Sequence, residues 1–126
     1  MIKLLEKLNE RKPLIADGAM GSLLMAKGMK SGECPELLNL DNPEIPEQVA
    51  KEYFEAGAEI IQTNSFGGSA IKLSEFNQSD KTEKINFEAA RIVKSVVGDN
   101  AYVSGSVGPT GKMLEPFGDC TESEMI

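Results

Sequence analysis

The fold is decided by residues 14–22, whose sequence is LIADGAMGS. A short apolar run that follows Pro13 and ends in an acidic residue is typical of a buried β-strand, and the glycines after it indicate a tight turn. We therefore expect Asp17 at the carboxyl end of a strand. Because Gly18 and Gly21 permit close approach of the backbone, this turn is able to present main-chain N–H groups to a small ligand.

Two later segments repeat this pattern of an apolar strand that runs into polar and glycine residues. They are residues 60–68 (IIQTNSFGG), in a strand expected over 59–63, and residues 102–111 (YVSGSVGPTG), in a strand expected over 101–107. Strands that alternate with helices indicate a parallel sheet joined by right-handed crossovers. This alternation fits both an open doubly wound sheet and the first part of an eight-stranded barrel. Polar residues at the ends of all three strands favour the barrel.

Helices are expected where apolar residues recur at helical spacing. The longest is residues 82–97, in which Ile85, Ala89, Ile92, Val93 and Val96 form one apolar face that we assign to the core. The other expected elements are helices at 2–11, 22–27, 45–57 and 70–76, a long loop at 30–42, and a helix start at the Thr-x-x-Glu capping box of residues 121–124. A helix start so close to Ile126 predicts that the chain is truncated.

Composition excludes several functional classes. The formal net charge of −7 and the absence of Lys or Arg runs argue against nucleic acid and anionic membrane surfaces as partners. No apolar stretch approaches the ~20 residues of a membrane span, so we expect a cytoplasmic protein. Histidine is absent, which excludes His-based catalysis and His metal ligands, and the two cysteines, Cys34 and Cys120, match no metal-binding or disulfide spacing.

Four segments together carry a family resemblance. They are DGAMGS (17–22), LNLDNPE (38–44), YFEAGAEIIQTNSFG (53–67) and GSVGPTG (105–111). In order and spacing they resemble the N-terminal part of homocysteine S-methyltransferase domains, a family that includes the homocysteine-binding module of cobalamin-dependent methionine synthase. The resemblance extends over essentially the whole chain.

The resemblance implies an α/β fold in which residues 1–126 form the first three βα units of a TIM-type (β/α)8 barrel, incomplete in this chain. It also implies a zinc-dependent enzyme that transfers a methyl group to the homocysteine thiol to give methionine. The implied partners are homocysteine and a methyl donor, with cobalamin on a corrinoid protein or domain among the carriers that the family uses. The sequence does not identify the donor.

The resemblance also assigns residues. The family's zinc ligands are one cysteine and a later adjacent pair, all in the second half of the barrel, and Cys34 and Cys120 lie at neither position. We therefore expect no zinc site, no catalytic residue and no activity in this chain alone. At the substrate end, the resemblance implies that the Asp17, Gly18 and Ala19 turn contacts the amino and carboxylate groups of homocysteine. The residues that would line the same mouth are Asn64, Ser65 and Phe66.

Simpler interpretations stay open beside these. Asp17 is also explained as a turn acid that accepts hydrogen bonds from nearby backbone N–H groups, and Thr63, Asn64 and Ser65 as polar residues that satisfy backbone groups at a strand end. For the whole chain, the alternatives are a small non-catalytic α/β binding protein and a part-barrel that self-associates, because a three-stranded sheet leaves edges and apolar faces uncovered.

Overall fold

A small parallel sheet forms the centre of the computed structural model, which describes residues 3–125. Strand β1 (Ile60–Gln62) pairs in parallel with β2 (Tyr102–Ser104), so that Ile61 lies opposite Val103. The expected strand at 14–16 is reduced to a single parallel bridge between Ala16 and Ile60. The pairing is short because Pro13 has no N–H to donate and the chain turns at Gly18, so only the few residues between them are able to pair.

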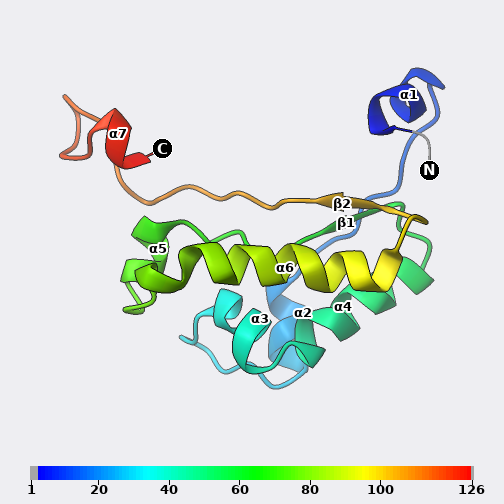
Figure 1. The fold of residues 1–126 in the computed structure, drawn as a ribbon, viewed down its shortest axis with the longest axis horizontal. Coiled ribbons are helices and arrows are strands. Elements are labelled where there is room, and N and C mark those ends of the chain that lie inside the picture. Colours follow the sequence, from blue (N-terminus) through cyan, green and yellow to red (C-terminus); the bar gives the residue numbers. More distant parts are fainter. Residues whose placement is uncertain (1–2, 126) are drawn as a thin grey trace.

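Two long helices cover one face of the sheet (Figure 1). Helix α4 (Glu44–Glu55) precedes β1, and α6 (Thr82–Val97) connects β1 to β2. The bounds of α6 are those predicted, and its residues Ile85, Ala89, Ile92 and Val93 are buried as expected. Val96 is partly buried and packs against the same core. The buried residues of this core between the helices and the sheet are Ala50, Ala58, Ile61, Val93, Val97 and Ala101.

The expected long loop at 30–42 is wrong for its second half. Residues Pro35–Leu37 form a 3₁₀ helix, η1, and Leu38–Asp41 form α3. Leu38 and Asn39 are buried there, so this segment packs into the protein instead of crossing its surface. The helices were missed because four residues complete barely one turn, which is too short to show a 3.6-residue period.

The remaining elements are short, and all of them except one unpredicted 3₁₀ helix agree with the predicted order. Helix α1 spans Leu4–Asn9 within the expected helix at 2–11, of which Ile2 lies outside the described residues. The other short elements are α2 (Gly21–Ala26), α5 (Ala70–Ser74), the 3₁₀ helix η2 (Ser79–Lys81) and α7 (Glu122–Met125).

The predicted capping box at the start of α7 is present. The Thr121 backbone N–H donates to Glu124 Oε2 over 2.8 Å, and the Thr121 hydroxyl donates to the same oxygen over 2.7 Å. These two hydrogen bonds lower the pKa of Glu124, because they stabilise its ionised form. The sequence signal for this helix start is therefore confirmed, and Ile126 lies outside the described residues.

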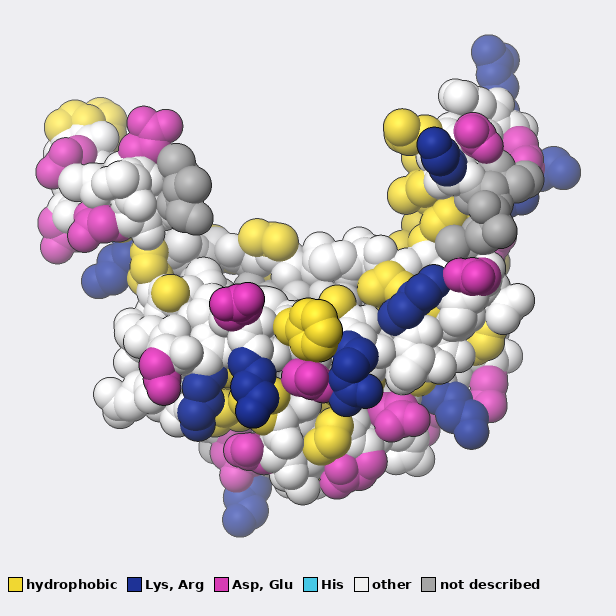
Figure 2. All heavy atoms as spheres, in the orientation of Figure 1, with side chains coloured by type: hydrophobic (Ala, Val, Ile, Leu, Met, Phe, Trp, Pro, Cys, Tyr) yellow, Lys and Arg dark blue, Asp and Glu magenta, His cyan; other side chains and the backbone are white. Residues whose placement is uncertain are grey.

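The opposite face of the sheet is open. Figure 1 shows α2, α3, α4 and α6 on one side of the strands, with α1 and α7 projecting on the other side at the two ends. The space-filling view shows a hollow between these two projections (Figure 2). Among the described residues, no helix combines the length and the apolar character that crossing a membrane requires. The chain is thus a mixed α/β structure whose small parallel sheet is covered by helices on one face.

Candidate functional site

The carboxyl ends of the parallel strands surround a cavity of about 330 Å³, which we call the strand-end pocket. One wall is the turn after the first strand, a second is the segment that follows β1, and η1 closes a third side. Parallel strands place their carboxyl ends at one edge of a sheet, which is why turns distant in sequence meet here. The residues that line the pocket are Gly18, Met20, Gly21, Leu24, Pro35, Glu36, Gln62, Thr63, Asn64, Ser65, Phe66 and Ser106.

Of the six residues predicted to bind substrate, four line this pocket: Gly18, Asn64, Ser65 and Phe66. Asp17 and Ala19 belong to the same turn but are not among the lining residues. The Ala19 carbonyl accepts a hydrogen bond from the Tyr53 hydroxyl over 2.9 Å. This bond fixes the turn to α4.

Asp17 ties the first strand to β1. Its Oδ2 accepts a hydrogen bond from the Gln62 backbone N–H over 2.8 Å, and its Oδ1 accepts one from Gln62 Nε2 over 3.1 Å. The Asp17 backbone N–H donates to the Ile60 carbonyl over 2.9 Å, which completes the connection. Both carboxylate oxygens therefore already have donors within the protein. The simpler interpretation of Asp17 is met in part, because one donor is a backbone N–H, although it belongs to β1 and not to the turn itself.

Gly18 lies where the turn approaches α4 closely. A Cβ at this position would lie 3.1 Å from the Tyr53 hydroxyl oxygen, closer than most side-chain contacts. The absence of a side chain therefore lets the turn lie against Tyr53 while it forms the wall of the pocket.

Asn64 is buried and joins β1 to η1 and α3. Its Nδ2 donates to the Pro35 carbonyl over 2.7 Å and to Asn39 Oδ1 over 3.2 Å. In return, Asn39 Nδ2 donates to the Asn64 carbonyl over 2.7 Å. These reciprocal bonds satisfy two buried amide side chains and hold η1 against the pocket.

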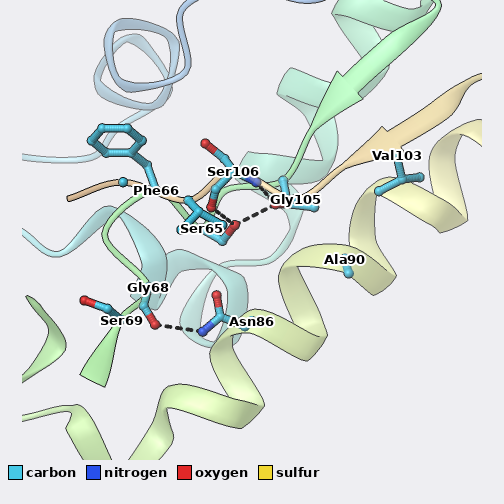
Figure 3. A pocket seen from close by; sticks show the side chains of 12 residues that line it. Ser65, Phe66, Gly68, Ser69, Asn86, Ala90, Val103, Gly105 and Ser106 are labelled. Carbon is cyan, nitrogen blue, oxygen red and sulfur yellow. Dashed lines mark hydrogen bonds between the residues drawn. The ribbon is translucent and has the colours of Figure 1, made fainter. Parts of the chain in front are cut away.

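A hydroxyl pair joins β1 to the segment after β2. Thr63 Oγ1 and Ser65 Oγ lie 2.6 Å apart, the Ser65 hydroxyl donates to the Ser106 carbonyl over 2.8 Å, and the Ser106 N–H donates to Thr63 Oγ1 over 3.1 Å. Figure 3 shows Ser65 and Ser106 linked in this way. The Gly108 N–H also donates to the Phe66 carbonyl over 2.9 Å. The two strand-end turns are consequently held as one unit.

Glu36 was not predicted as a site residue. It is the second residue of η1, is 5 % exposed and lines the strand-end pocket. Its Oε1 accepts a hydrogen bond from the Gly67 backbone N–H over 2.7 Å, and its Oε2 accepts one from the Cys34 thiol over 3.4 Å. Burial raises the pKa of the Cys34 thiol, so this thiol is a donor at neutral pH. Sequence reasoning missed Glu36 because it lies in the segment predicted as a loop.

A second cavity, of about 430 Å³, lies on the helix side of the same turns. Figure 3 shows Asn86 reaching from α6 toward Gly68, where its Nδ2 donates to the Gly68 carbonyl over 2.8 Å. Ala90 and Val103 line the far wall, and the residues that line this cavity include no charged side chain. We therefore regard the strand-end pocket as the better candidate for recognition of a polar ligand.

The described residues provide no set of metal ligands. Between residues 3 and 125, no three His, Cys, Asp or Glu side chains gather closely enough to hold a metal ion. Cys34 precedes η1. Cys120 lies in the loop before α7, where its backbone forms an isolated parallel β-bridge with Leu114. Both are free thiols and buried.

Comparison with known proteins supplies the family. The model of the family described as homocysteine S-methyltransferase matches residues 14–126. The chain is 31% identical over 122 residues to methionine synthase of Mycobacterium tuberculosis, an alignment that covers 87% of this chain and 10% of that protein. It is 32% identical over 122 residues to methionine synthase of Mycobacterium leprae, with the same coverage. The chain thus spans about a tenth of the length of these relatives.

Solved structures with a similar fold include two of the homocysteine methyltransferase MmuM from Escherichia coli. The metallated form superposes with a TM-score of 0.68 at 24% sequence identity, covering 85% of this chain and 42% of that one. The oxidized form gives a TM-score of 0.71 at 23% identity, covering 85% and 41%. The family model matches nearly the whole chain, and the strand-end turns form a pocket at the carboxyl ends of the strands. This chain therefore belongs to the homocysteine S-methyltransferase family.

Proposed function

We propose that this chain is the N-terminal part of a homocysteine S-methyltransferase barrel and supplies the substrate end of its active site. In this proposal, residues 1–126 form the first three βα units of a TIM-type barrel. The complete enzyme transfers a methyl group to the homocysteine thiol and produces methionine. The observation that carries the proposal is the strand-end pocket, which the DGAMGS turn and the β1 turn of the family motifs build together.

The pocket suits a small amino acid. Its volume of about 330 Å³ lies at the lower end of the range for small-molecule sites, and its lining combines the apolar Met20 and Leu24 with the polar turn after β1. Such a division matches a ligand with a polar amino acid end and an apolar thioalkyl end. Gly18, Asn64, Ser65 and Phe66 would line the bound ligand, and the Asp17 and Ala19 positions would support the turn from behind.

The only support for zinc in the complete enzyme is the family to which the chain belongs. The described residues of this chain do not fit a zinc site, because they bring no set of thiols or other ligands together. We therefore assign no step of the reaction to a metal held by this chain. Any zinc ligands, and the choice of methyl donor or corrinoid partner, would come from other parts of the enzyme.

Isothermal titration of the chain with reduced L-homocysteine tests the substrate assignment. We expect saturable binding of homocysteine, and weaker binding of L-serine, which lacks both the thiol and one methylene group. A methyl-transfer assay with added zinc and each donor class should show no turnover. Absence of homocysteine binding would contradict the proposed substrate, and robust turnover by the pure chain would contradict the assignment of the catalytic groups to other parts.

A further inference from the structure

The first turn of the strand-end pocket has few connections to the rest of the protein. Asp17 is bonded to β1 where the turn begins, and the Met20 carbonyl accepts a hydrogen bond from α2 where it ends. Between these two points, within residues 3–125, Gly18 and Ala19 form a single hydrogen bond, which the Ala19 carbonyl accepts from the Tyr53 hydroxyl over 2.9 Å. Gly18 lines the pocket, so this wall is connected to α4 through Tyr53.

The core holds the Tyr53 side chain in place. It packs against the cluster between the helices and the sheet, and also against a second cluster formed by Leu24, Leu38 and Val49. The Tyr53 carbonyl accepts a hydrogen bond from the Ala58 N–H over 3.1 Å, which fixes the end of α4 as well. Because the ring is ordered by these contacts, the hydroxyl has a defined position before any ligand binds.

Gly18 and the Tyr53 hydroxyl also fit each other sterically. A Cβ on Gly18 would lie 3.1 Å from the hydroxyl oxygen, whereas the nearest ring carbons would be at 3.7 Å, an ordinary contact distance. The backbone of Gly18 has no positive φ angle, so its conformation is open to alanine. The close approach of the Tyr53 oxygen is therefore what opposes a side chain at this position.

We propose that Tyr53 is a positioning residue that sets the first wall of the strand-end pocket and so tunes the affinity of the pocket for its small amino acid ligand. The inference rests on the proposed function, in which that ligand is homocysteine. Tyr53 is not among the residues that line the pocket, so it acts through Gly18 and Ala19.

The variant Tyr53→Phe tests this role, because it removes the hydroxyl and keeps the ring that packs on both clusters. We expect homocysteine binding, measured by isothermal titration, to weaken about threefold to tenfold, the range that loss of one hydrogen bond gives. The backbone amide resonances of Gly18 and Ala19 should also shift in the unliganded chain. The matched control is Ser95→Ala, which removes a hydroxyl that donates to the Ile92 carbonyl within α6 and should change neither measurement.

A double-mutant cycle separates positioning from general stabilisation. Gly18→Ala alone should weaken homocysteine binding by about tenfold, because the new methyl group meets the Tyr53 hydroxyl oxygen. In the Tyr53→Phe background the same change should cost less than about twofold, since the closest remaining contacts are at 3.7 Å. If Tyr53 only stabilised the fold, the two effects on affinity would add.

Thermal unfolding of each variant verifies that it is folded. Additive effects in the cycle, or unchanged homocysteine affinity in Tyr53→Phe, would overturn the positioning role while leaving the proposed function in place. Absence of homocysteine binding by the unmodified chain would contradict the proposed function. In that case the amide resonances of Gly18 and Ala19 in unliganded Tyr53→Phe would still decide whether Tyr53 positions the turn.

Discussion

Asp17 is a residue of the first family motif that acts as a structural residue. Its carboxylate accepts two hydrogen bonds from Gln62 and so links the first strand, which pairs through a single bridge, to β1. Because the backbone hydrogen bonds between these two segments are confined to residues 15–17 and 59–60, the side chain extends a short pairing. Whether Asp17 also contacts homocysteine stays a prediction.

We predict that Asp17→Asn lowers the free energy of unfolding by about 1–2 kcal/mol, because its amide NH₂ would face a Gln62 donor in place of an acceptor. Urea denaturation measures this change. Asp80→Asn, at an exposed aspartate of η2, is the control and should differ little from the unmodified chain. Equal stability of the two variants would show that the Gln62 hydrogen bonds contribute nothing.

Cys34 gives a second prediction at this scale. Burial raises the pKa of its thiol, so at mildly alkaline pH the reactive thiolate is scarce and poorly accessible. In the variant Cys120→Ser, we expect iodoacetamide to modify Cys34 at least about tenfold more slowly in buffer than in concentrated urea. Intact mass spectrometry follows the reaction. Equal rates in the two conditions would mean that Cys34 is not buried in solution.

At the scale of elements, the turns after β1 and β2 depend on close backbone contact. A Cβ on Gly108 would lie 2.5 Å from the Phe66 carbonyl oxygen, whereas a Cβ on Gly21 would meet nothing within 4 Å. Because the Phe66 carbonyl is a backbone group, a change of side-chain rotamer would not relieve its clash with a Cβ on Gly108. Gly21 lies at the start of α2, where alanine is a better helix former than glycine.

We therefore predict opposite effects of the same substitution at these two glycines. Gly108→Ala should lower the free energy of unfolding by more than about 1 kcal/mol, and Gly21→Ala should leave it unchanged or raise it by a few tenths of a kcal/mol. Denaturant unfolding of both variants gives the comparison. Equal stabilities would contradict the contact between the two strand-end turns.

The start of α7 should respond to acid. Because the hydrogen bonds from Thr121 lower the pKa of Glu124, the capping is present above the ordinary glutamate value of 4.5 and is lost as the pH falls through the lower folded value. The amide proton resonance of Thr121, followed by NMR during acid titration, should shift over this window. In Glu124→Gln the shift should disappear. A Thr121 resonance that titrates identically in both proteins would contradict the capping box.

The long helices were predictable from the sequence, and so were the short elements that carry a capping or glycine signal, but the short helices within residues 35–41 were not. Helix α6 runs for 16 residues, so its apolar face repeats often enough to mark both ends. Helix α3 has four residues and repeats nothing, which is why residues 38–41 were expected to be loop. Among site residues, the glycine and polar turns were visible after each strand. Glu36 was not, because charge alone does not indicate that a short helix turns a carboxylate inward.

At the scale of the whole molecule, the sheet has one covered and one open face. Ile15 and Asp17 are two residues apart, so both side chains point to the same side of the first strand. Asp17 meets the Gln62 side chain, whereas Ile61 packs beneath the helices, which places Ile15 on the open face. Ile15 is 62% exposed there.

We predict that the chain self-associates through this open face at concentrations of tens of micromolar, because exposed strands and apolar side chains favour association. Sedimentation velocity at several concentrations measures the effect. Ile15→Ser should weaken association, whereas Phe87→Ser, at an exposed residue of α6, should not. A monomer that unfolds cooperatively at all concentrations would instead favour a complete small binding domain.

We propose that the strand-end turns form the homocysteine end of a methyltransferase site. The most direct test is NMR of the ¹⁵N-labelled chain titrated with reduced L-homocysteine. We predict saturable shifts at the backbone amides of Gly18 and Gly21 in the first turn and of Asn64, Ser65 and Phe66 in the second, all of which line the pocket. Shifts confined to other surfaces, or none at saturating ligand, would contradict the account.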